Sequence, residues 1–199
     1  MEGHIRFGSL AHYMSIEDEA RRDENEGASL FSHGDGLLIN NISQNVSGNL
    51  EGYTFVSQVK TGEIFISCFS RALNPELWNK FSALFCVEIT KIGIFIEKIR
   101  VSLPSDSTVY FRRVQYYDRD DNPTPRWAVP EVIASSKLNL YSQEEESRLL
   151  FSTTDALRFE NVDLCLRHKS VQHSPIKPAS PFFNLNIGDI QHICTLHQR

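Results

Sequence analysis

Short apolar runs of strand length recur along this 199-residue chain, and Gly, Pro, Asn and Ser residues of turn character separate them. The runs with strand character are residues 4–8, 37–42, 53–59, 63–70, 84–90, 108–117, 149–151, 159–166 and 183–193. Only a few helices fit between these runs, and most of them fall early in the chain. This pattern predicts a single α+β domain over residues 1–199 with a mostly antiparallel sheet.

Helix and turn signals lie between the runs. Ser9 is a suitable N-cap for a helix that begins at Leu10, and Asn74-Pro75 has the composition of a second helix start. Residues 91–103 fit both the helical and the strand period, so their conformation stays open. Lys60-Thr61-Gly62 has turn character and predicts that the strands on either side form a hairpin.

Charge and composition exclude several classes of protein. The net charge of −5 argues against broad, phosphate-driven binding to duplex nucleic acid. No C-x-x-C motif occurs, so a zinc site is not expected and the four cysteines are predicted to be reduced core thiols. The chain has no apolar signal region and no apolar run as long as a membrane span, which predicts a cytoplasmic protein without membrane contact.

The segment Ser142–Phe151 places three glutamates directly before the apolar run Leu149-Leu150-Phe151. A carboxylate at the start of a strand is held rigidly, and burial and neighbouring charges there can tune its pKa. If Glu146 begins the strand, Glu146 and Arg148 share one face of it. The ordinary alternative is that the three glutamates form a solvated loop. If the predicted strand start is displaced, Glu144 or Glu145 would take the place of Glu146.

Three short motifs stand in a suggestive order. His4 and Arg6 lie on the first strand, ahead of the polar segment R-R-D-E-N-E-G; the strand I-F-I-S-C-F-S-R covers residues 64–71; and the glutamates precede the Leu149 strand. In this order the chain resembles the ADP-ribosyltransferases, and most closely the DarT-type toxins that modify nucleic acid. It is also similar to uncharacterised bacterial proteins that contain F-G-S-L and E-x-R before a strand. The resemblance spans less than half of the chain and implies a split β-sheet core with flanking helices.

The resemblance also implies roles for individual residues. Glu146 would be catalytic with help from Arg21, and NAD would be the substrate, with no metal. The residues implied to hold NAD are His4, Arg6, Arg22, Ser67, Phe69 and Ser70. These types suit the chemistry, because arginines bind pyrophosphate, serines bind the nicotinamide amide and a phenylalanine stacks on its ring. Which of His4 and Arg6 contacts NAD stays open, and the segment Glu17–Gly27 has an ordinary interpretation as a charged helix face.

The resemblance further implies a nucleic-acid acceptor, single-stranded DNA or RNA, ahead of a protein acceptor. Arg126, Trp127 and Tyr117 are the candidates for contacting this substrate, because a flipped or single-stranded base needs only a local groove with aromatic stacking. A toxin or phage-defence effector with an antitoxin or chaperone partner is then expected. The alternatives are a non-catalytic nucleotide-binding or inhibitor module that uses the same cleft, and an NAD glycohydrolase.

Overall fold

The computed structural model describes residues 2–16, 22–168, 170 and 181–198, without the side chains of residues 125 and 126. The strands are β1 (Glu2–Ser9), β2 (Ala28–Phe31), β3 (Leu37–Asn41), β4 (Val46–Leu50), β5 (Tyr53–Gln58), β6 (Ile64–Ser70), β7 (Phe85–Ile89), β8 (Tyr110–Arg113), β9 (Gln115–Tyr117), β10 (Ser136–Leu138), β11 (Glu146–Ser152), β12 (Asp163–His168), β13 (Phe182–Asp189) and β14 (Cys194–Gln198). The helices are α1 (Leu10–Ser15), α2 (Pro75–Lys80), α3 (Ile92–Ser102) and α4 (Pro130–Ile133), with 3₁₀ helices η1 (Pro125–Ala128), η2 (Asn139–Glu144), η3 (Asp155–Leu157) and η4 (Phe159–Asn161). The predicted α+β class is confirmed.

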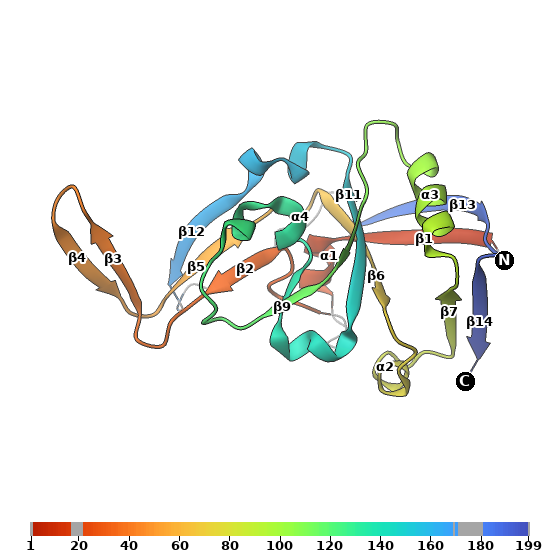
Figure 1. Cartoon of the computed structure of the whole chain (residues 1–199), viewed down its shortest axis with the longest axis horizontal. Coiled ribbons are helices and arrows are strands. Elements are labelled where there is room, and N and C mark those ends of the chain that lie inside the picture. Colours follow the sequence, from red (N-terminus) through yellow and green to blue (C-terminus); the bar gives the residue numbers. More distant parts are fainter. Residues whose placement is uncertain (1, 17–21, 169, 171–180, 199) are drawn as a thin grey trace.

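Two antiparallel sheets form the centre of the structure (Figure 1). The larger one has five strands in the order β13-β1-β6-β11-β8, and the smaller one has three in the order β12-β5-β2. A short parallel pair, β9 with β10, lies beside them. The expectation of mostly antiparallel pairing is therefore correct.

The five-stranded sheet is covered on both faces, which is why β11 is buried along its whole length. On one face, Phe7, Leu149 and Phe151 pack with Phe95 and Ile99 of α3. The other face packs against α1 and α4 through a second apolar cluster, whose buried members are Leu10, Val59, Ile64, Ile66, Ile133, Ala134, Leu150 and Ala156. Because side chains alternate along a strand, this second face also carries Glu146 and Arg148.

The local signals for helices are borne out. The Ser9 side chain accepts a hydrogen bond from the backbone N–H of His12, and the Asn74 side chain accepts one from Glu76 N–H, so both are N-caps. The ambiguous segment 91–103 is the helix α3, whose buried Phe95 and Ile99 are one helical turn apart.

The predicted hairpin around Lys60-Thr61-Gly62 is wrong. The two strands follow each other as expected, but β5 pairs with β2 and β12, whereas β6 pairs with β1 and β11. A turn signal shows that the chain changes direction; it does not show whether the next strand stays in the same sheet.

The cysteine prediction also needs correction. All four cysteines are free, but none is a buried core residue: Cys68 and Cys165 are exposed, and Cys86 and Cys194 are half-buried. Cys68 lies on β6 in the lining of a cavity, and Cys165 lies on β12, which is an edge strand of the three-stranded sheet. Within the described residues, no helix is both long enough and apolar enough to traverse a bilayer.

Candidate functional site

A cavity of about 530 Å³ opens where the ends of β6 and β11 meet α1, α2 and the loop that precedes β2. Its lining combines carboxylates, cations and aromatic rings: Arg6, His12, Tyr13, Ile16, Arg22, Glu26, Ser67, Cys68, Phe69, Ser70, Leu77, Phe81, Lys137, Tyr141, Glu144, Glu146 and Phe182. Ligand sites of this size usually combine apolar walls with a few fixed polar groups.

Glu146 is the first residue of β11, as the sequence predicts, and it lies in the cavity wall with only 4% of its surface exposed. The preceding residue, Glu145, has a left-handed backbone (φ 44°) that ends η2 and turns the chain into the strand. The backbone N–H of Glu146 donates to the Tyr116 hydroxyl at 2.9 Å. Strand pairing to Ser70 and this hydrogen bond fix the position of the residue.

Arg148 lies two residues further along the same face and is completely buried. Its Nε donates to Glu146 Oε1 at 2.6 Å. Its guanidinium also holds both oxygens of Glu26, with Nη1–Oε1 at 2.5 Å and Nη2–Oε2 at 3.0 Å, and Nη1 donates to the Ala134 carbonyl at 2.7 Å. Arginine suits this position because its planar fork can serve several acceptors at once.

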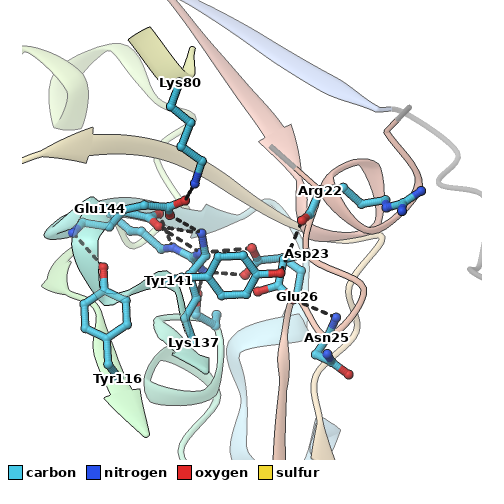
Figure 2. A network of polar contacts seen from close by, with 12 residues as sticks. Arg22, Asp23, Asn25, Glu26, Lys80, Tyr116, Lys137, Tyr141 and Glu144 are labelled. Atoms are coloured by element: carbon cyan, nitrogen blue, oxygen red, sulfur yellow. Dashed lines mark hydrogen bonds and ion pairs between the residues drawn. The ribbon is translucent and has the colours of Figure 1, made fainter. Parts of the chain in front are cut away.

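Lys137 completes the cluster from β10. Its ammonium group lies 2.9 Å from Glu146 Oε2 and 2.9 Å from Glu144 Oε2. Glu144 is shared in turn with Lys80 of α2, at 2.7 Å, so that the two lysines approach this carboxylate from opposite sides (Figure 2). We call Glu26, Lys80, Lys137, Glu144, Glu146 and Arg148 the charge cluster.

The charge cluster determines the ionisation of Glu146. Burial by itself would raise the pKa of this carboxyl group, but the charges of Arg148 and Lys137 outweigh burial and lower the pKa to about 2. Burial acts to lower the pKa of Lys137, and the surrounding carboxylates, Glu26 first, nevertheless raise it. Near neutral pH the cavity therefore contains a fixed, ionised carboxylate that is a weak base.

The loop before β2 supplies buried acids to the same place. Asp23 and Glu26 are 3% and 2% exposed, and residues 22–27 form coil and turn, so the described part of the segment is not a solvated helix face. Gly27 permits this arrangement: its φ is +72°, and a Cβ atom there would lie 2.8 Å from the Thr61 side chain. Burial and then the Glu26 carboxylate raise the pKa of Asp23 to about 6.

The cationic candidates for binding NAD separate into two places. Arg6 and Arg22 both line the cavity. Arg6 lies over the Phe182 ring at 4.8 Å and donates to Asn184 Oδ1 at 3.3 Å, while the Arg22 side chain points away from the charge cluster (Figure 2). His4 shares the face of Arg6 on β1 but is exposed in a different hollow, with Nε2 3.2 Å from Glu2.

The candidates on β6 all border the cavity, but alternation divides their side chains. Ser67 and Phe69 face α3, on the side opposite to Glu146, and the Phe69 ring packs edge-on against Phe95. Ser70 is directly opposite Glu146 in the ladder, and its hydroxyl donates to the Ala72 carbonyl at 3.0 Å. Of these three residues, Ser70 is the one whose side chain is on the side of the charge cluster.

Trp127 and Tyr117, two of the residues expected to form the substrate groove, lie outside the cavity. The Trp127 ring stacks on Phe55, and the Tyr117 hydroxyl accepts the Leu30 N–H at 3.0 Å, so both residues pack on the three-stranded sheet and are not in the cavity lining. Burial is the main cause that raises the pKa of Tyr117 to about 12. The Arg126 side chain and the whole of Arg21 lie outside the described residues.

Sequence reasoning missed several members of the site. The predicted site residues do not include Glu26, although it lies in the segment R-R-D-E-N-E-G, nor do they include Lys137 or the lining residues His12, Tyr13 and Tyr141. One usable signal was the lone lysine in V-I-A-S-S-K-L, because a charged residue in an apolar run needs a partner. The pairing of Glu26 with Arg148 joins residues 122 positions apart, which no local pattern reports.

Comparison of the chain with protein-family models, curated proteins and solved structures gives no match. Among the described residues, no three His, Cys, Asp or Glu side chains are grouped as metal ligands would be. The geometry of the cavity is thus the basis for the functional proposal.

Proposed function

We propose that the protein is an NAD-dependent ADP-ribosyltransferase, with Glu146 as its catalytic carboxylate. The observation that carries the proposal is a buried, ionised glutamate at the start of a central strand, fixed in the wall of a cavity of about 530 Å³. Cleavage of the bond between nicotinamide and ribose develops positive charge on the sugar. A rigid carboxylate stabilises such charge more effectively than a mobile one, because no reorganisation is needed.

The remaining lining of the cavity suits a dinucleotide. Arg6 and Arg22 are cations suited to the pyrophosphate, and Phe182 and Tyr13 add aromatic rings to the lining. The pKa of about 2 supports an electrostatic and positioning role for Glu146 over that of a general base. Lys137 and Arg148 are then positioning residues, which keep the carboxylate ionised and oriented.

The pairing of Glu146 also favours a second candidate. Both oxygens of the carboxylate already contact cations, Arg148 at 2.6 Å and Lys137 at 2.9 Å. A carboxylate neutralised in this way is suited to holding a ribose hydroxyl without turnover. A non-catalytic nucleotide-binding module is therefore the second proposal.

For the acceptor we propose nucleic acid, either single-stranded DNA or RNA, ahead of protein, on the resemblance to the DarT-type toxins. In that case the wild-type protein would act as a toxin or phage-defence effector inside the cell. Production of the wild type should then inhibit growth of the host, and Glu146→Gln should relieve the inhibition. Normal growth at a high level of wild-type protein would contradict the toxin proposal.

The test of the activity is nicotinamide release from NAD, measured with binding of NAD to the same preparations. We expect Glu146→Gln to lower release by about 100-fold or more, while its affinity for NAD falls less than about 10-fold. Glu146→Asp keeps the charge but withdraws it by one methylene, and should also lower release. Thermal unfolding of each variant shows whether the fold is retained.

The matched control is Glu145→Gln. This neighbouring glutamate has half of its side chain exposed, pairs with Arg71 at 3.5 Å and is not in the cavity lining. Equal losses in Glu145→Gln and Glu146→Gln would contradict the assignment of Glu146. Binding of NAD by the wild type without release of nicotinamide would instead support the binding module, and absence of both would overturn the two proposals.

A further inference from the structure

The hairpin of β3 and β4 is separate from the sheets that form the core. It is a two-stranded sheet of its own, and it stands clear of the other described elements at the end of the molecule away from both termini (Figure 1). Every residue from 38 to 49 is exposed, and Ile42 at the tip is 92% exposed. We call residues 37–50 the arm. An isolated two-stranded hairpin is at best marginally stable in water, so an arm of this kind is expected to have a partner.

The outer edges of the arm lack the usual protection against pairing. Natural edge strands carry Lys, Pro, inward-pointing charges or a bulge that blocks another strand. Residues 37–50 include no charged residue and no proline, although 23% of the chain is charged. The register from Leu37↔Leu50 to Asn41↔Val46 is regular, without a bulge. Both edges therefore offer backbone N–H and C=O groups to a further strand.

The side chains of the arm are self-complementary. They are aliphatic, amide or hydroxyl groups, such as Leu38, Ile39, Asn40 and Ser47. An amide both donates and accepts hydrogen bonds, so a strand edge with asparagines can meet a copy of itself without the like-charge repulsion that lysines or glutamates would cause. The lack of cations argues against nucleic acid or an anionic membrane as the occupant. The lack of any charge likewise removes the complementary ion pairs that usually select a different protein.

We propose that the arm binds the arm of a second copy of this chain, with the two β3 edges paired antiparallel about a two-fold axis. The β3 strand, Leu-Leu-Ile-Asn-Asn, is the better edge, because β4 contains Gly48, which weakens a strand. In this arrangement Ile39, the central residue of β3, lies closest to its symmetry mate. The interface is small, so we expect a weak dimer whose population depends on protein concentration.

The test is sedimentation velocity of the purified protein from about 1 to 100 μM. The wild type should shift from monomer to dimer over this range. Ile39→Lys places two like charges beside the axis and should remain monomeric, as should a variant in which a short Gly-Ser linker replaces residues 37–50. The fold should be retained in both, because the substituted residues are exposed or half-buried in the monomer.

The matched control is Val101→Lys. Val101 is an aliphatic residue on α3 that is 73% exposed, and replacing it adds the same charge outside the arm. Dimerisation of Val101→Lys like the wild type, with monomeric Ile39→Lys, supports the proposal. A wild type that stays monomeric at 100 μM, or a dimer that persists in Ile39→Lys, overturns it. The arm is not in the cavity lining, so nicotinamide release should be unchanged in Ile39→Lys, and the two proposals fail independently.

Discussion

The buried position of Arg148 gives a prediction whose size can be worked from the structure. Arg148→Met removes the cation that neutralises Glu26 and Glu146 while keeping much of the side-chain volume. Breaking a buried ion pair by removing one partner typically costs about 3–5 kcal/mol. The pKa of Glu146 gives a second figure, because a decrease from 4.5 to about 2 corresponds to about 3 kcal/mol of stabilisation, to which Arg148 contributes most and Lys137 also contributes.

The two figures are of the same order, and the second also gives the pH dependence. The pKa of Glu146 is lower in the folded state than in the unfolded state, so its contribution to stability is complete above about pH 4.5. This contribution is lost as the pH falls from about 4.5 to about 2, as the carboxylate becomes protonated. In Arg148→Met the pKa should be much less depressed, so the difference in stability between wild type and variant should shrink at low pH.

Urea unfolding followed by tryptophan fluorescence measures this directly. At pH 7 we expect Arg148→Met to lower the free energy of unfolding by about 3–5 kcal/mol. Adding Glu26→Gln should restore part of that loss, because the two residues share one interaction. The control Arg158→Met removes an exposed arginine paired with Asp155, and should change stability by less than about 0.5 kcal/mol. A loss below about 1 kcal/mol for Arg148→Met, or an equal loss at pH 7 and pH 3, would refute the reasoning.

Two further predictions concern buried polar groups. The pKa of Asp23 is raised from 3.8 to about 6, so ionisation of Asp23 destabilises the folded state as the pH rises through this interval. At pH 7, Asp23→Asn should therefore increase the free energy of unfolding by up to about 3 kcal/mol. Near pH 4 the same substitution should have little effect. Urea titrations at the two pH values check this, and equal effects would contradict it. Tyr117→Phe removes the acceptor of the Leu30 N–H and should cost about 1–2 kcal/mol in the same assay. A variant as stable as the wild type would show that this hydrogen bond contributes little.

The sequence predicts those parts of the structure that depend on local chemistry. The N-caps Ser9 and Asn74 each accept a hydrogen bond from a backbone N–H in the first turn of their helix, so a few neighbouring residues contain the whole signal. Once Glu146 is taken as the start of β11, strand alternation alone places Arg148 on the same face, and the structure confirms both.

Long-range partners could not be predicted in this way. Whether β6 continues the sheet of β5 depends on which strands lie beside it, and β1 and β11 are distant in the chain. The same limit explains Tyr117 and Trp127. Their sequence neighbours are aromatic and arginine-rich, as in a binding groove, but in the structure the two residues pack against β2 and β5. In the sequence Glu26 is one of several charges in a polar run, and its buried ion pair with Arg148 is visible only in the structure.

The most direct measurement of the central proposal is transfer of label from radioactive NAD. Purified wild type and Glu146→Gln would each be incubated with total RNA, with single-stranded DNA and with cell lysate. We predict that label appears on RNA or single-stranded DNA with the wild type and is absent with Glu146→Gln. Label only on lysate proteins would contradict the nucleic-acid acceptor, and release of nicotinamide without labelling would identify hydrolysis. If the wild type leaves NAD intact in all three mixtures, the ADP-ribosyltransferase proposal is wrong.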